Sequence, residues 1–147
     1  MEFSAGVLDE AGANSRFDRM LAAAEDVPFA KRPVIERHSG LVVGYVGVGW
    51  MDFEGARRLE FGYRFVPEAR GLGYATEGGV AMLALAEEAF AGELLATIDP
   101  TNIASKRVAA KLGFEFWKIA EVNGFVDEVH RRHVGARALL PDSPTAQ

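Results

Sequence analysis

The segment ARGLGYATEG, residues 69–78, contains the residues whose types and spacing are best suited to holding a ligand. Arg70, Gly73 and Ala75 fit the spacing Arg/Gln-x-x-Gly-x-Gly/Ala between a predicted strand and a predicted helix. Small residues there allow successive backbone N–H groups to face outward at a helix N-terminus, where the helix dipole also favours anions. The segment predicts a cradle that a pyrophosphate would fit, although an ordinary glycine-rich turn explains the residues about equally well.

Two other phosphate-binding motifs fit this segment less well. A Rossmann fingerprint has three glycines at its own spacing within a repeated mononucleotide unit, whereas this segment lies in mid-chain after several predicted antiparallel strands. A Walker loop requires Gly-Lys-Ser/Thr, which the sequence does not contain. Coenzyme A is therefore the better-matched anion.

The elements that would position this segment follow from hydrophobic periodicity and turn residues. The predicted order is a helix at 15–27, a strand from 33, a turn at 38–40, a strand at 41–50, a hairpin loop at 52–58, a strand at 59–66, a helix at 75–90, a strand at 94–98, a helix at 103–112, and a hairpin of strands 114–122 and 125–134. The run 94–98 is apolar apart from Thr97, which is typical of a strand covered on both faces. A strand-helix-strand unit joins parallel neighbours, so we expect 59–66 and 94–98 to be parallel.

Side chains alternate between two faces in the strand predicted at 59–66. The apolar face carries Leu59, Phe61, Tyr63 and Phe65, and the other face carries Glu60, Gly62 and Arg64. For the whole chain the pattern predicts one α+β domain over residues 1–147, with irregular tails at 1–13 and 136–147.

Composition and spacing argue against several classes of function. The net charge of -5, from 16 basic and 21 acidic side chains, gives no overall basic field for nucleic acid. The absence of cysteine excludes disulfides, thioester intermediates on the protein and cysteine zinc sites.

His130 and His133 should face opposite sides of a strand, so we expect no metal site. No run approaches the length of a membrane span, and we expect a cytoplasmic protein.

Two blocks of sequence, EFGYRFVPEARGLGYATEG and then NIASKRVAAKLGF, resemble the GNAT superfamily and within it the RimJ/RimL-like branch. The resemblance covers roughly residues 34–123. It implies an α/β/α fold with a bent, mixed and mostly antiparallel sheet. It further implies that two central parallel strands splay apart to admit the pantetheine arm of acetyl-CoA.

The same resemblance implies the site residues. The expected coenzyme contacts are Phe65, Val66, Arg70, Gly71, Leu72, Gly73, Tyr74, Ala75, Thr76, Asn102, Ser105 and Arg107. Main-chain groups of Phe65 and Val66 would pair with the pantetheine like an added strand, and the loop amides would hold the pyrophosphate. Asn102 and Ser105 would make polar contacts with the pantetheine or the sulfur, although an asparagine at this position also caps a helix. Arg107 could reach a phosphate or merely meet water.

Acetyl transfer to an amine requires a neutral nitrogen, a route for its proton, and stabilisation of the oxyanion and the leaving thiolate. Glu60 is the candidate base because family members often have a carboxylate on this strand, although a solvated charge explains it about equally well. The N–H near Val66 would donate to the oxyanion. Ser105 or a water would protonate the thiolate.

One departure from the branch concerns the start of the chain. Members usually open with a strand of the type Arg-Leu-x-Leu-Arg, and MEFSAGVL is a poor substitute, so we expect the first strand to be missing or degenerate, or to lie upstream. A homodimer would be one way to cover the exposed sheet edge. The leading prediction is an N-acetyltransferase acting on a primary amine. The alternative is a non-catalytic acyl-CoA-binding module, and a different nucleotide-binding fold is the third reading.

Overall fold

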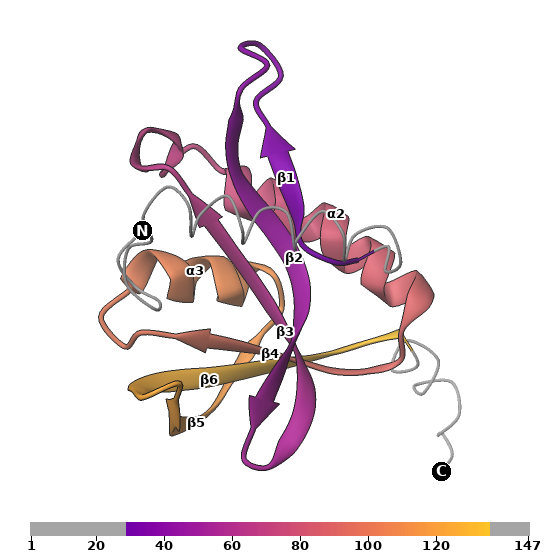
Figure 1. Ribbon diagram of the computed structural model, residues 1–147, viewed down its shortest axis with the longest axis vertical. Helices are drawn as coiled ribbons and strands as arrows, with labels where there is room; N and C mark the ends of the chain where they lie inside the picture. Colours follow the sequence, from indigo (N-terminus) through magenta and orange to yellow (C-terminus); the bar gives the residue numbers. More distant parts are fainter. Residues whose placement is uncertain (1–28, 136–147) are drawn as a thin grey trace.

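The computed structural model describes residues 29–135, which form a six-stranded sheet and two α-helices (Figure 1). The elements are β1 (Arg32–Ile35), β2 (Val42–Phe53), β3 (Ala56–Phe65), the 3-10 turn η1 (Pro67–Ala69), α2 (Tyr74–Ala89), β4 (Gly92–Ile98), α3 (Ile103–Lys111), β5 (Glu115–Val122) and β6 (Phe125–Val134). The helix predicted at 15–27, the question of a first strand, and the two predicted tails lie outside the described residues.

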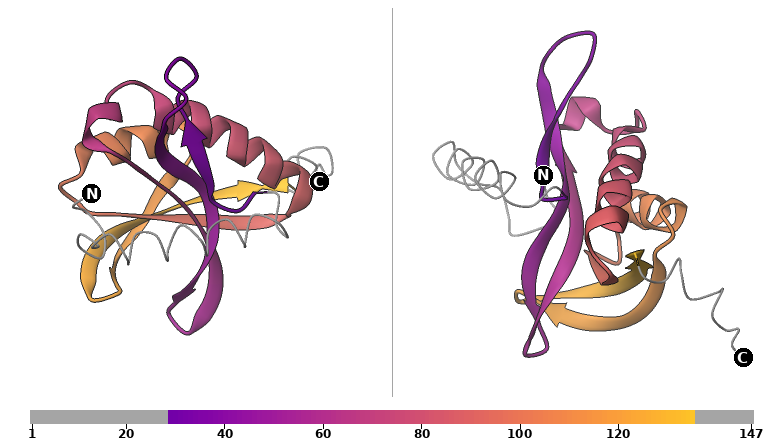
Figure 2. Two further views of the ribbon diagram at one scale, coloured as in Figure 1. Left: turned by 45° about the horizontal axis from the view of Figure 1, so that its top comes forward. Right: turned by 90° about the vertical axis from the view of Figure 1, so that its right-hand side faces the viewer.

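The sheet has the strand order β1-β2-β3-β4-β6-β5, and β3 with β4 is the parallel pair between neighbouring named strands. The other four pairs of neighbours are antiparallel. The long β2–β3 hairpin stands upright in Figure 1, whereas β4 and β6 run across it, so the sheet is strongly bent at its centre. Both described helices lie on one side of the β1–β3 portion (right view of Figure 2). This arrangement confirms the predicted GNAT-type mixed sheet.

The central parallel strands pair over a short stretch only. Their register comprises Leu59 with Leu94 and Glu60 with Leu95. Beyond these pairs β3 continues to Phe65 and β4 to Ile98 without further pairing between them. We call this opening the fork, and it confirms the prediction that the two central strands splay apart.

The core explains why these segments form strands. Leu94 and Leu95 are both fully buried although consecutive side chains on a strand point to opposite faces. They belong to two different clusters, one beneath the helices with Leu59 and Phe61, the other on the opposite face with Phe53. The prediction that this strand is covered on both faces is confirmed.

The β2–β3 connection is tighter than predicted. The loop expected at 52–58 is wrong, because β2 extends to Phe53 and β3 begins at Ala56, leaving Glu54 and Gly55 as the turn. Both turn residues have positive φ angles, 51° and 82°, which suits the right-handed twist of the two strands. The other predicted elements within the described range are present, with ends that differ by a few residues.

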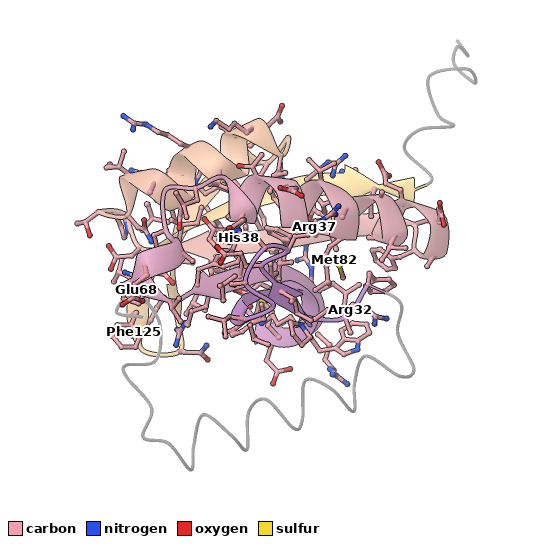
Figure 3. All side chains as sticks on the ribbon, turned by 90° about the horizontal axis from the view of Figure 1, so that it is seen from above. Arg32, Arg37, His38, Glu68, Met82 and Phe125 are labelled. Carbon is pink, nitrogen blue, oxygen red and sulfur yellow. The ribbon has the colours of Figure 1, made fainter. Side chains whose placement is uncertain are left out.

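Helix α2 packs closely against its neighbours because it carries glycine where they approach. A Cβ atom on Gly79 would lie 2.6 Å from a methyl carbon of Leu112. Met82, labelled in Figure 3, is 5% exposed and belongs to the core cluster between α2 and the sheet. This packing fixes the start of α2 relative to the end of β3. Among residues 29–135, no helix is long and apolar enough to cross a membrane.

Candidate functional site

A cavity of about 490 Å³ lies between the end of β3, the loop that follows it, and helix α3. Its lining includes most of the predicted coenzyme contacts, namely Phe65, Arg70, Gly71, Gly73, Tyr74, Ala75, Thr76, Asn102, Ser105 and Arg107. Two others, Val66 and Leu72, are not part of the lining and are 37% and 60% exposed. The remaining lining residues are Tyr63, Arg64, Ala69, Ala104, Val108 and Lys111.

The glycine loop, which we define as residues 70–76, exposes its amides. Gly71 and Gly73 adopt φ angles of 76° and 86°, a conformation that disfavours residues with a Cβ. Gly73 is the N-cap of α2 without a side-chain cap bond, so the first helical N–H groups lack an intrahelical acceptor. Within residues 29–135, no loop or cap hydrogen bond begins at the N–H groups of 71–76. These amides are therefore available to an anion.

Arg70 is engaged with the protein. Its backbone N–H donates to the carbonyl of Pro67 at 3.2 Å, and its Nε donates to the carbonyl of Phe65 at 3.2 Å. The guanidinium thus ties the glycine loop to the last residue of β3. Its amide does not join the row of available donors, and its charge remains at the rim of the cavity.

The main chain at the end of β3 corrects one expectation. The N–H of Val66 donates to the carbonyl of Val43 at 2.9 Å, so it points to β2 and cannot donate to an oxyanion in the fork. The β2–β3 register is regular from Phe53 with Ala56 to Gly44 with Phe65. Because backbone groups alternate along a regular strand, the N–H of Phe65 points to the opposite side, where β3 no longer pairs with β4.

A pair of hydroxyl groups lies across the cavity, between β3 and α3. The Tyr63 hydroxyl donates to Oγ of Ser105 at 3.0 Å, and Oδ1 of Asn102 accepts the N–H of Ser105 at 3.1 Å. Asn102 is therefore the N-cap of α3, as its helix-capping interpretation predicted. Burial raises the pKa of Tyr63. Tyr63 thus remains protonated at neutral pH, and the Ser105 proton is left free for another acceptor.

Helix α3 presents two cations to the cavity. Arg107 and Lys111 are four residues apart and both line it. Lys106 does not line the cavity, and its ammonium contacts Glu128 at 3.2 Å. Because these cations line the same cavity as the glycine loop, the cavity is suited to phosphate groups.

Glu60 lies outside this cavity, on the face of β3 opposite Leu59 and Phe61. Its Oε2 accepts the hydroxyl proton of Thr97 at 2.6 Å. Asp127 of β6 is close enough for its pKa to be affected: burial raises it most, followed by repulsion from Asp99 and Glu60. We call this group, Glu60, Thr97, Asp99 and Asp127, the acidic side of the fork. The Lys31 ammonium lies near it, 3.7 Å from where a Cβ on Gly62 would be.

The two histidines do not meet. His130 is 8% exposed and contacts Glu128 at 2.9 Å, whereas the His133 side chain is 53% exposed. Within the described range, no three His, Asp or Glu side chains form a group that could hold a metal ion.

Comparison with known proteins gives the family. A family model for the acetyltransferase (GNAT) domain matches residues 1–115. The chain therefore belongs to the GNAT acetyltransferases. YkkB of Bacillus subtilis (strain 168) is 36% identical over 85 residues, which are 56% of this chain and 49% of YkkB. The chain thus spans about half the length of this curated relative.

Solved structures share the fold. A Bordetella pertussis protein assigned to the GNAT-family acetyltransferases superposes with a TM-score of 0.74 at 21% identity, over 85% of this chain and 78% of that one. The phosphinothricin acetyltransferase of Sinorhizobium meliloti, solved in complex with acetyl-CoA, has a TM-score of 0.67 at 20% identity, over 87% and 71% of the two chains. At these identities the likeness establishes the fold alone.

Sequence reasoning missed several residues of these two sites. Tyr63 was assigned to the apolar face by alternation, and its hydroxyl partner lies 42 positions away on another element. Thr97 lies within an apolar run, and its partner Glu60 is 37 positions earlier. Lys111 could have been found, because its spacing of four from Arg107 places both on one helical face.

Proposed function

We propose that this protein transfers the acetyl group of acetyl-CoA to a primary amine by direct attack of the amine on the thioester. The acceptor would be a small molecule, an amino acid or a protein N-terminus. The observation that carries the proposal is the fork beside a cavity of about 490 Å³ whose glycine loop has amides without a hydrogen-bond partner in the described part of the chain. A pyrophosphate requires such amides, and a linear thioester arm requires such an opening.

The coenzyme would occupy the cavity. The N–H groups of residues 71–76 would hold the pyrophosphate at the start of α2, where the helix dipole adds to the attraction. Arg107 and Lys111 would neutralise phosphate charge from α3. The unpaired edge of β3 near Phe65 would pair with the pantetheine amides as an added strand. Family membership supports this placement.

The thioester supplies an activated carbonyl, and the protein supplies the proton and charge management. Glu60 would take the proton from the attacking nitrogen, directly or through water, as the new C–N bond forms. The N–H of Phe65 would donate to the oxyanion in place of Val66. When the C–S bond breaks, the Ser105 hydroxyl, held by Tyr63, would give the thiolate a proton that solvent then replaces.

The need for a base depends on the acceptor. An α-amine has a pKa of about 8 and is partly neutral at neutral pH, whereas a lysine-type amine near about 10.4 is mostly protonated. Three carboxylates, Glu60, Asp99 and Asp127, lie on the acidic side of the fork. That charge favours a cationic amine that loses its proton on arrival.

Two measurements test the proposal. Acetyl-CoA at about 100 times its dissociation constant should stabilise the protein by about 2.7 kcal/mol, and NAD or ATP should do less. Thiol release should then follow addition of members of an amine panel. Stabilisation without turnover of any amine would instead indicate a non-catalytic acyl-CoA-binding module. Stronger stabilisation by NAD or ATP would contradict coenzyme A binding.

Finer assignments rest on the sequence. We include membership of the RimJ/RimL-like branch on the two blocks that resemble it, and a cytoplasmic location as a further expectation. We propose one domain over residues 1–147, with acetyl-CoA and an amine as its ligands. A homodimer is a further expectation, and sedimentation would test it.

A further inference from the structure

One side-chain hydrogen bond crosses the fork where the main-chain pairing ends. Glu60 forms the last β3–β4 pair, with Leu95, and Thr97 lies two residues further along β4. The Thr97 hydroxyl donates to Oε2 of Glu60 at 2.6 Å. A side chain thus continues the link between the two strands one step past their last backbone pair.

Both side chains lie on the face of the sheet away from α2 and α3. Thr97 shares the face of Leu95, which packs in the cluster with Phe53. Glu60 is opposite Leu59 and Phe61, which pack in the cluster beneath the helices. The contact therefore borders the side of the fork opposite the cavity.

The hydrogen bond leaves one carboxylate oxygen available. Oε2 of Glu60 accepts the Thr97 proton, whereas Oε1 has no hydrogen-bond partner among residues 29–135. Glutamate has several rotatable bonds, and holding it in one geometry is entropically costly. A short hydrogen bond to a charged acceptor is strong enough to favour one geometry. The free oxygen is then directed while the other is fixed.

We propose that Thr97 is a positioning residue for acetyl transfer and that it acts through Glu60. The inference rests on the proposed function, in which Glu60 takes the proton of the acceptor amine. Thr97 touches neither the coenzyme nor the reacting atoms in this scheme. Its hydroxyl holds Oε2 so that Oε1 faces the nitrogen as the strands part. No proton is transferred to or from Thr97.

The first experiment compares Thr97→Val, which keeps the shape and removes the hydroxyl, with Thr97→Ser, which keeps the hydroxyl. Thr97→Val should lower kcat by about tenfold to a hundredfold, because small displacements of a catalytic group have effects of this size. Its acetyl-CoA dissociation constant should stay within about twofold of the wild-type value. Thr97→Ser should recover most of kcat. Unchanged kcat in Thr97→Val, failed rescue by serine, or a parallel loss of acetyl-CoA affinity would each overturn the inference.

Thr101 offers a matched control. Its hydroxyl also donates to a carboxylate at 2.6 Å, that of Asp99, but it makes no contact with Glu60. The backbone N–H of Thr101 donates to the same Asp99 oxygen at 2.8 Å, so Asp99 stays held in Thr101→Val, which should leave kcat unchanged within about twofold. An equal loss in both threonine variants would show a general effect of removing a hydroxyl and would overturn the role of Thr97.

A double-mutant cycle then separates positioning from structural support. In a Glu60→Gln background, Thr97→Val should cost less than about a further twofold, because the group that it positions is already lost. Multiplying effects would mean that Thr97 acts independently of Glu60 and would overturn the inference. A wild-type protein that turns over no amine would instead overturn the proposed function, so the two failures are distinguishable. Circular dichroism and the acetyl-CoA thermal shift check that each variant folds.

Discussion

The two sides of the fork present different kinds of chemical group. On the cavity side, the main elements are backbone groups, namely the N–H groups of 71–76 and the N–H of Phe65 where β3 no longer pairs with β4, and the cations Arg107 and Lys111 line the same cavity. On the acidic side they are charged and hydroxyl side chains, Glu60, Thr97 and Asp127, contributed by β3, β4 and β6.

Because of this difference, we expect the two sides to tolerate different substitutions. Backbone donors depend on conformation, so positions such as Gly73 matter there while most side chains can vary. On the acidic side, the functional groups are side chains that the register of three strands brings together. One substitution there removes a functional group while the fold remains. In the proposed function, the cavity side would bind the coenzyme and the acidic side would bind the acceptor amine.

The largest expected effect comes from breaking the acidic side alone. Glu60→Gln should lower kcat by about a hundredfold or more, because general-base catalysis typically contributes that much. Acetyl-CoA affinity should change by less than about twofold, since Glu60 does not line the cavity. Steady-state thiol release and calorimetric titration of acetyl-CoA measure the two quantities. A normal kcat would remove Glu60 from the mechanism.

The same contrast explains what the sequence predicted. The fold and the cavity side could be predicted because the sequence patterns that indicate them are local. Gly71 and Gly73 mark the loop, Asn102 precedes a helix, and the run at 94–98 is apolar apart from Thr97. Each pattern constrains its own few residues through backbone conformation or burial.

The contacts of the acidic side could not be predicted from local patterns. The contact of Thr97 with Glu60 depends on which residues of β3 and β4 face each other, and the strands are joined through α2. Asp127 reaches the group only through the pairing of β6 with β4. The amide of Val66 was misassigned for a similar reason, because a one-residue shift reverses the direction of a backbone N–H.

A smaller effect is expected from straining the cavity side. Gly73→Ala places a Cβ at a φ of 86° and should cost about 1–2 kcal/mol of conformational energy. The loop can avoid this strain only by turning its amides, so acetyl-CoA affinity should fall by about tenfold while kcat at saturation stays near normal.

Gly124 supplies the matched control for that variant. It has a φ of 84° in the β5–β6 turn, and neither glycine has an atom within 4 Å of a built Cβ. Gly124→Ala should therefore lower the free energy of unfolding by a similar amount without changing affinity. Equal affinity losses in both variants would mean that global stability, and not the loop amides, sets coenzyme binding.

A still smaller effect on acetyl-CoA affinity is expected for Arg107 of α3, and none for its neighbour Lys106. Arg107 lines the cavity, whereas Lys106 is paired with Glu128. Arg107→Ala should weaken acetyl-CoA binding by about threefold to fivefold at low salt and by less at high salt, because added ions screen the attraction. Lys106→Ala should leave the dissociation constant unchanged. Titrations at two ionic strengths measure both variants, and equal losses would contradict the assignment.

The smallest expected effect concerns the tie between the glycine loop and the β1–β2 turn. Glu36 accepts hydrogen bonds from Ser39 at 2.6 Å and Tyr74 at 2.5 Å, and these bonds, that of Ser39 first, hold its pKa below the ordinary value of 4.5. Since the pKa is lower in the folded state, the stabilisation is present above the ordinary value and is lost as pH falls through the lowered one. Glu36→Gln should therefore lower Tm at neutral pH by about 2 °C or less, and the difference should shrink at acidic pH as Glu36 becomes protonated. Glu68→Gln is the control, because its exposed carboxylate makes no hydrogen bond or ion pair among residues 29–135 (Figure 3), and it should change Tm at neither pH. A Tm difference for Glu36→Gln that persists at acidic pH would show that the tie depends on the shape of the side chain and not on its charge.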